Sequence, residues 1–169
     1  MLSNIQTYKL SSLEWEQYKD IRLEALREDG EAFGDSYGES LQFNDSHWQE
    51  EFENPRSLML VARDGVKTVA LAAAYQEEGE KMRHIAYVWG VYVKKAYRGK
   101  GIGKKILVEL IEEIKTFKGI EKIDLNVNTS QLSAVWLYEK LGFKLVGTLH
   151  NELKIGTQYF DEHVMEMFL

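Results

Sequence analysis

The sequence predicts an α/β fold in which one mixed β-sheet of about seven strands carries helices on both faces. Three observations lead to this prediction. Strand-like segments separated by short turns occupy residues 57–94, which indicates an antiparallel meander. A strand, a helix and a second strand fill residues 84–128, and such a crossover makes its two strands parallel neighbours. Two further strands are expected after residue 142.

The composition is that of one globular domain, residues 1–169. Hydrophobic residues make up 44% and charged residues 28% of the chain, which are ordinary values for such a domain. No apolar run approaches the ~20 residues of a membrane helix, and the N-terminus lacks the pattern of a signal peptide. Cysteine is absent, which excludes disulfides, thiolate metal sites and a cysteine nucleophile. We therefore expect a cytoplasmic protein with no metal site and no membrane partner.

One short strand and two helices are expected before residue 57. Residues 5–10 form the strand. Ser11 begins the first helix, because a glutamate three residues later completes a capping box, and apolar residues recur at helical spacing to about Arg27. Ser46 begins the second helix in the same way, with glutamine three residues later, and this helix ends before Pro55.

The meander consists of three strands. Residues 57–63 are apolar, and the dipeptide Asp64-Gly65 favours a tight hairpin turn. The partner strand covers residues 66–75. Residues 84–94 are rich in β-branched and aromatic residues and form the third strand.

The helix of the crossover begins near Ile102. Its apolar residues recur every three or four positions, at Ile102, Ile106, Leu107, Leu110, Ile111 and Ile114. Residues 122–128 alternate between apolar and polar side chains, as a half-buried strand does.

The C-terminal part begins with a helix capped by Thr129 or Ser130. Gly142 ends this helix, since glycine readily adopts the left-handed conformation of a helix C-terminus. Residues 143–153 and 159–168 are the last two strands.

Positive charge is concentrated at the start of the crossover helix, although the net charge of −6 argues against nucleic-acid binding. Six basic residues fall within twelve positions, with no carboxylate between them: Lys94, Lys95, Arg98, Lys100, Lys104 and Lys105. The glycines among them would leave backbone N–H groups open at a helix N-terminus, where the helix dipole also favours anions. The segment therefore predicts a binding site for a ligand with more than one phosphate.

Two common phosphate-binding loops fit this segment less well. A Walker A loop needs G-x-x-x-x-G-K-[ST], but the interval from Gly99 to Gly103 is one residue short and Lys104 precedes another lysine. A dinucleotide fingerprint needs G-x-G-x-x-G, and neither glycine pair is followed by its third glycine. A nucleotide-binding protein that uses this loop remains an alternative.

The loop resembles a third pattern. The spacing of Arg98, Gly101 and Gly103 resembles the [QR]-x-x-G-x-[GA] loop of the GNAT superfamily of N-acetyltransferases. Two longer segments also resemble that family, WGVYVKKAYRGKGIG at residues 89–103 and SAVWLYEKLGF at residues 133–143. The resemblance implies a GNAT-like fold and the transfer of an acetyl group from acetyl-CoA, the cosubstrate, to a primary amine of a small molecule or peptide. It also implies a possible homodimer.

The resemblance assigns roles to individual residues. The loop amides would bind the pyrophosphate of acetyl-CoA, from Gly99, Lys100, Gly101, Ile102 and Gly103, with Arg98 at the start of the loop. Val91 and Val93 would pair their backbones with the pantetheine arm. Tyr138 would be the general acid near the thioester sulfur. Gln131 stands where the family commonly has asparagine, and its amide can still contact the cofactor.

Direct attack by the amine on acetyl-CoA needs neither a cysteine nor a metal. The alternative to such an enzyme is a GNAT-like module that binds CoA without turnover. The sequence names neither the acceptor nor the general base. Asp161 and Glu162 are expected in a solvated turn near the last strand, from which they could line an acceptor site. The resemblance implies that the region of Phe33, Tyr37 and Trp48 borders the acceptor pocket. Trp48 and Trp136 themselves are expected in the core.

Overall fold

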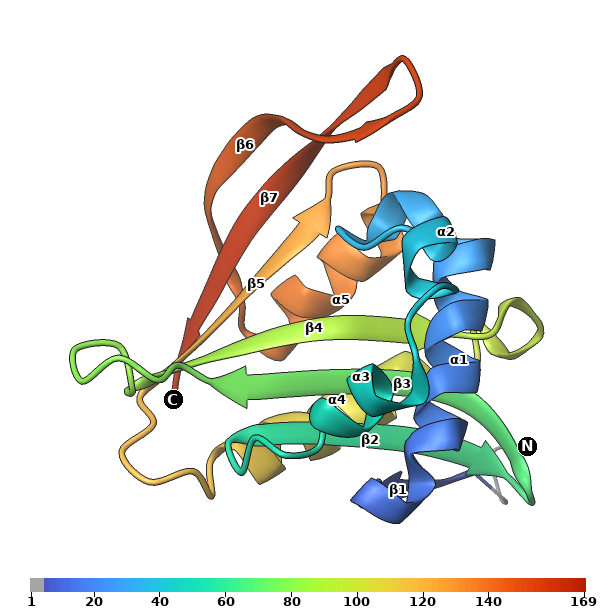
Figure 1. Ribbon diagram of the computed structural model, residues 1–169. Coiled ribbons are helices and arrows are strands. Elements are labelled where there is room, and N and C mark those ends of the chain that lie inside the picture. Colours follow the sequence, from blue (N-terminus) through green and yellow to red (C-terminus); the bar gives the residue numbers. More distant parts are fainter. Residues whose placement is uncertain (1–4) are drawn as a thin grey trace.

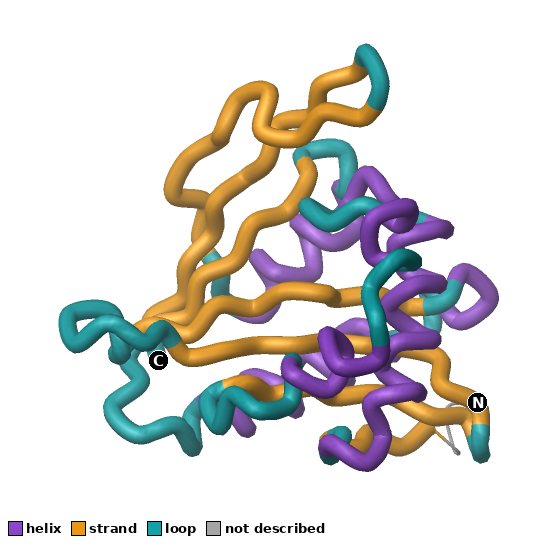
Figure 2. Tube along the Cα trace, in the orientation of Figure 1, coloured by secondary structure: helices purple, strands orange, loops and turns teal. Residues whose placement is uncertain are grey.

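Seven strands form one sheet in the computed structural model, which describes residues 5–169 (Figures 1 and 2). The strands are β1 (Ile5–Lys9), β2 (Ser57–Asp64), β3 (Lys67–Gln76), β4 (Ile85–Val93), β5 (Lys122–Asn128), β6 (Lys144–Ile155) and β7 (Gln158–Phe168). Their order in the sheet is β1-β2-β3-β4-β5-β7-β6. All neighbouring strands are antiparallel except β4 and β5, so the predicted mixed sheet with one parallel pair is confirmed.

Helices cover both faces of the sheet. They are α1 (Trp15–Glu28), α2 (Tyr37–Ser40), α3 (Asp45–Glu50), α4 (Ile102–Ile114) and α5 (Leu132–Leu141), with 3-10 turns at Ser12–Glu14, Gly30–Ala32 and Lys95–Tyr97. One core joins α4 and α5 to the sheet and includes Ile106, Leu110 and Tyr138. A second core, with Ile21 and Trp48, joins α1 and α3 to the other face. None of the helices within residues 5–169 combines the length and the apolar character of a membrane span.

The apolar stripe of α4 fixes the position of the glycine loop. All six predicted stripe residues are buried, namely Ile102, Ile106, Leu107, Leu110, Ile111 and Ile114. A fully buried Leu or Ile side chain stabilises the fold by about 1.5–3 kcal/mol. The stripe therefore holds the N-terminus of α4 firmly at the end of β4.

The sheet opens between β4 and β5. These two strands are paired only from Ile85 opposite Lys122 to Val88 opposite Leu125, and Figure 1 shows them diverging beyond that point. Gly90, with φ of 65°, accompanies an irregularity in the pairing of β3 with β4. Such a bulge bends a strand. Within the described residues, the edge of β4 that faces β5 therefore has no partner strand after Val88.

The N-termini of the first helices follow the capping rules with one correction. The Ser11 capping box is confirmed, since its backbone N–H donates to Glu14 Oε2 at 3.0 Å. The predicted capping box at Ser46 is wrong. The side chain of Asn44 caps α3 instead and accepts a hydrogen bond from the His47 N–H at 3.0 Å. Asparagine is as effective at this position as serine, so the helix begins two residues earlier.

The start of α5 also differs from the prediction. Its N-cap is Gln131, not Thr129 or Ser130. The side chain of Asn128 organises the preceding turn, because its Oδ1 accepts from the Ser130 N–H at 2.9 Å and its Nδ2 donates to the Glu31 carbonyl at 2.7 Å. The predicted stop at Gly142 is confirmed, with φ of 106°.

The cap of α3 gives a test of these assignments. Asn44→Ala is expected to lower the free energy of unfolding by about 1 kcal/mol, because the His47 N–H loses its partner. Ser46→Ala, in the first turn of the same helix, is expected to change it by less than about 0.5 kcal/mol. Urea denaturation of both variants measures the difference, and equal losses would contradict the assignment of Asn44 as the cap.

Candidate functional site

A cleft of about 490 Å³ lies where β4 and β5 diverge. Its walls come from the second half of β4, the glycine loop, the first turns of α4, the end of β5 and one side of α5. The predicted site residues that line it are Val91, Val93, Arg98, Gly99, Gly101, Ile102, Gly103, Gln131 and Tyr138. Lys100 does not line the cleft, and its ammonium donates to the Ala96 carbonyl at 2.8 Å. Residues from three separate parts of the sequence therefore share one cavity.

The glycine loop has the backbone conformation of an anion-binding turn. Gly99 and Gly101 have φ of 72° and 79°, in the left-handed region that other residues rarely adopt. Gly101 is the N-cap of α4, and its carbonyl accepts the first helical hydrogen bond from the Lys105 N–H at 3.0 Å. No side chain of the described residues caps this helix. The N–H groups of its first turn are thus available to a ligand.

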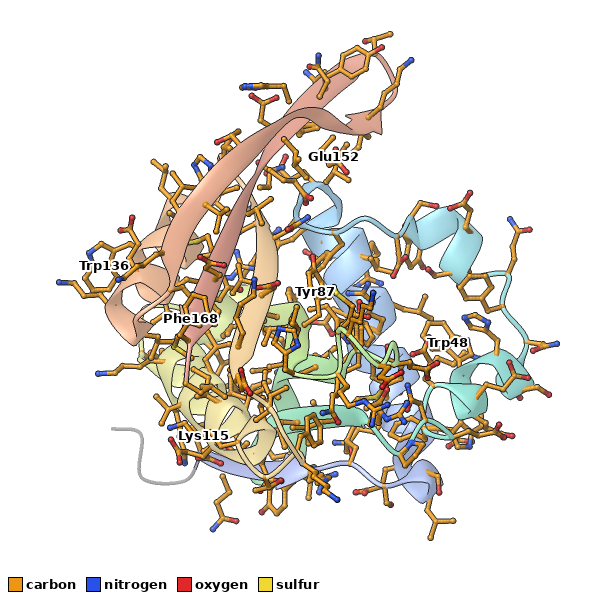
Figure 3. All side chains as sticks on the ribbon, turned by 90° about the vertical axis from the view of Figure 1, so that its left-hand side faces the viewer. Trp48, Tyr87, Lys115, Trp136, Glu152 and Phe168 are labelled. Atoms are coloured by element: carbon orange, nitrogen blue, oxygen red, sulfur yellow. The ribbon has the colours of Figure 1, made fainter. Side chains whose placement is uncertain are left out.

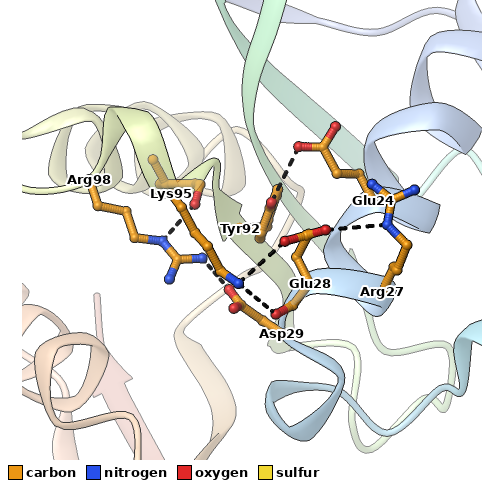
Figure 4. A network of polar contacts seen from close by, with 8 residues as sticks. Glu24, Arg27, Glu28, Asp29, Tyr92, Lys95 and Arg98 are labelled. Atoms are coloured by element: carbon orange, nitrogen blue, oxygen red, sulfur yellow. Dashed lines mark hydrogen bonds and ion pairs between the residues drawn. The ribbon is translucent and has the colours of Figure 1, made fainter.

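The basic cluster is partly neutralised by the end of α1. Lys94 forms an ion pair with Glu24 at 2.7 Å. Figure 4 shows two further pairs, Lys95 with Glu28 at 3.3 Å and Arg98 with Asp29. Arg98 also donates from Nε to the Val93 carbonyl at 2.8 Å. These contacts fasten the loop to β4 and α1. An anion at this loop would therefore meet backbone amides and Lys104, which lines the cleft, more than the whole cluster.

Tyr138 reaches the cleft from α5. Its side chain is only 6% exposed, and its ring packs edge to face against Phe143 with the centroids 5.7 Å apart. Burial raises the pKa of the Tyr138 phenol above its ordinary value, with a smaller contribution from Tyr87. The phenol therefore stays protonated at neutral pH and can act as a hydrogen-bond donor inside the cleft.

Two polar lining residues on β5, Asn126 and Asn128, were not predicted as site residues. Phe33, which was expected near the acceptor pocket, lines the cleft from the loop after α1. Trp136 is 60% exposed and also lines the cleft, so the prediction that it lies in the core is wrong. Trp48 is 3% exposed and lies in the core as predicted. Helical spacing alone did not indicate that α5 covers the cleft with only part of its surface.

The last strand also differs from the expectation. Asp161 and Glu162 lie within β7 and not in a solvated turn. Glu162 is buried, and its carboxylate accepts a hydrogen bond from Asn126.

In the region from residue 5 to 169, no three His, Cys, Asp or Glu side chains come together as a metal site would need.

Comparisons with known proteins agree with this geometry. The sequence model of the acetyltransferase (GNAT) family matches residues 10–143. A probable spermine N(1)-acetyltransferase of Bacillus subtilis subsp. natto is 31% identical over 87 residues, which are 50% of this chain and 55% of that protein. The L-amino acid N-acetyltransferase AaaT of Escherichia coli is 25% identical over 123 residues, 72% of this chain and 75% of that protein. The chain thus spans about half the length of the first of these relatives.

A solved structure shows the same fold. It is that of yncA, a putative acetyltransferase from Salmonella typhimurium with its cofactor acetyl-CoA, with a TM-score of 0.84 at 17% identity, over 98% of this chain and 94% of that one. The family match covers most of the chain, including the strand, the loop and the tyrosine helix that build the cleft. The chain therefore belongs to the GNAT family of acetyltransferases.

Proposed function

We propose that this protein transfers the acetyl group of acetyl-CoA to a primary amine. One observation carries the proposal: an uncapped helix N-terminus, an unpaired strand edge and a buried phenol line the same cleft. Each of these features matches one part of an acyl-CoA thioester. The names of the relatives, a spermine and an amino-acid acetyltransferase, and the acetyl-CoA complex of the Salmonella protein support it.

The cleft can bind acetyl-CoA along its length. The amides from Gly99 to Gly103 would hold the pyrophosphate, since hydrogen bonds to a charged group contribute roughly 1.5–3 kcal/mol each. The pantetheine arm carries two amide groups and would pair with the free edge of β4 at Val91 and Val93, as an added strand does. Gln131, at the N-cap of α5, lies at the cleft wall, and its amide would contact the cofactor there.

The chemistry follows from holding both reactants in one place. A neutral amine attacks the thioester carbonyl, the new C–N bond forms, and the C–S bond breaks with its electron pair on sulfur. Well-oriented reactants can reach effective molarities of roughly 10⁵ M or more, so positioning supplies a large part of the rate. The Tyr138 hydroxyl would donate its proton to the sulfur as the bond breaks.

Ligand binding and thiol release test the proposal together. Acetyl-CoA at about a hundred times its dissociation constant is expected to raise the free energy of unfolding by roughly 2.7 kcal/mol, and ATP at the same concentration much less. Thiol release from acetyl-CoA is then measured with a panel of polyamines, amino acids and peptides. Binding without any amine-dependent thiol release would indicate a CoA-binding module. Equal stabilisation by ATP would favour a nucleotide-binding protein.

A further inference from the structure

A carboxylate is buried on the sheet face that α1 covers. Among the side chains that the structure describes, Glu162 is the only acidic one that is buried, with 8% exposure. It lies well inside β7, away from the turn after β6. Burial of a carboxylate is unfavourable unless a partner compensates for the lost hydration. The surroundings of Glu162 therefore need an explanation.

The register of β5 and β7 places Glu162 next to the cleft. Asn128 lies opposite Glu162 in this antiparallel pair. Asn126, on the same face of β5, donates from Nδ2 to Glu162 Oε2 at 3.3 Å. Both asparagines line the cleft between β4 and β5. The Glu162 carboxylate thus lies one strand beyond the cleft and is connected to it through the Asn126 amide.

Among the residues that the structure describes, no cationic side chain forms an ion pair with Glu162. Burial raises the pKa of the Glu162 carboxyl, the hydrogen bond from Asn126 opposes this, and Glu152 on β6 raises it further. Burial also raises the pKa of Tyr87 on β4 to about 12, and the negative charge of Glu162 adds to that shift. Tyr87 lies between the β6–β7 hairpin and the helices α1 to α3 (Figure 3). The groups that act on Glu162, namely Asn126, Glu152 and Tyr87, are thus neutral or acidic.

Neighbouring carboxylates on β7 have cationic or polar partners of their own. Glu166, four residues further along the same face, forms an ion pair with Lys122 at 3.0 Å. Asp161 accepts from His150 at 2.9 Å and from the Asn151 N–H at 2.8 Å. Glu162 differs from both, since the partner that the structure gives its side chain is a neutral amide. A cationic ligand would supply the compensation that this buried carboxylate lacks.

We propose that Glu162 binds the ammonium group of the acceptor and accepts its proton, with Asn126 and Tyr87 as the polar groups beside it. This rests on the transferase function proposed above. The acceptor is then a primary amine that arrives as a cation. It enters from the face of the sheet that α1 covers, which is opposite the face that α4 covers.

Glu162 and Tyr138 account for every proton that moves in this reaction. The ammonium gives one proton to the Glu162 carboxylate, and the nitrogen lone pair attacks the thioester carbonyl. The nitrogen of the adduct must lose a second proton. Tyr138 gives its own proton to the departing sulfur, and the proton from the nitrogen then restores the Tyr138 hydroxyl. Glu162 releases its proton to solvent, so that an alkylammonium and acetyl-CoA give an amide, CoA thiol and one free proton.

Kinetics of Glu162→Gln test the proposal, with spermine and alanine amide as probes. At pH 7 the variant is expected to lose about 100-fold in kcat/KM, while its dissociation constant for acetyl-CoA stays within twofold of the wild type. Glu166→Gln, on the same strand and face, is expected to stay within twofold in both quantities. Glu162→Asp is expected to recover part of the loss.

The pH profile separates proton transfer from a structural role. A protonated Glu162 cannot accept a proton. Wild-type kcat/KM is therefore expected to fall at low pH, with a midpoint above the ordinary pKa of a glutamate, and to be flat from there to the pKa of the amine. In Glu162→Gln, only amine molecules that are already neutral in solution can react. Below the pKa of the amine, kcat/KM of this variant is therefore expected to rise about tenfold per pH unit. A Glu162→Gln variant with the wild-type profile would overturn the proposal.

A binding measurement covers the case in which neither probe is acetylated. That result counts against the proposed transferase function for these amines. Calorimetry of spermine and alanine amide with the CoA-saturated protein then tests whether Glu162 binds the ammonium group. Binding at least tenfold weaker in Glu162→Gln than in Glu166→Gln supports the ammonium site. Equal binding, or no binding of either amine to the wild type, overturns it.

Discussion

Tyr138→Phe is expected to lower kcat for acetyl transfer by roughly 100- to 1,000-fold and to leave the dissociation constant for acetyl-CoA within about twofold of the wild type. A positioned general acid typically contributes 10²- to 10⁴-fold. The variant removes only the hydroxyl, since the ring and its edge-to-face contact with Phe143 remain. Thiol release at saturating acetyl-CoA gives kcat, and calorimetry gives the dissociation constant.

Tyr18→Phe is the matched control for this prediction. Tyr18 is also buried and its pKa is also raised by burial, but it belongs to the core under α1 and α3, away from the cleft lining. Its loss of a hydroxyl is expected to leave kcat within about twofold of the wild type. Wild-type kcat in Tyr138→Phe would remove this residue as the acid. The same loss in both variants would indicate a general effect on the fold.

The parts of the fold that the sequence predicts are those with local signals. The stripe from Ile102 to Ile114 follows helical periodicity, and all of its members are buried. The predicted hairpin joins β2 to β3, with Asp64 as the last residue of β2 and Gly65 in the turn. The loop from Gly99 to Gly103 is recognisable because its glycines and its position before a helix stand in one short segment. The seven strands and the single parallel pair follow from the order of such segments.

The parts that could not be predicted depend on contacts between distant segments. Arg98 meets Asp29 across 69 residues, and Asn126 meets Glu162 across 36. No short-range pattern indicates these pairs, because the register of one strand against another decides them. The sequence therefore locates the expected cofactor loop but leaves the acceptor side open. The structure changes Glu162 from a residue of a solvated turn into a buried neighbour of the cleft.

Gly101→Val is expected to weaken acetyl-CoA binding by roughly 10- to 100-fold, the equivalent of one lost hydrogen bond to a charged group. Gly101 has φ of 79°, which a β-branched residue adopts only with strain, so the loop must leave the conformation that aims its amides at the ligand. The strain itself costs about 1–2 kcal/mol of stability.

Gly65→Val separates the two effects, because Gly65 has a similar φ of 59° and lies in the hairpin between β2 and β3, outside the cleft lining. Both variants are expected to lose a similar amount of stability in urea denaturation, but only Gly101→Val is expected to lose affinity for acetyl-CoA in calorimetry. Unchanged affinity in Gly101→Val would mean that the pyrophosphate is held elsewhere. The basic side chains around the loop, above all Lys104, would then have to supply the binding that the backbone amides do not.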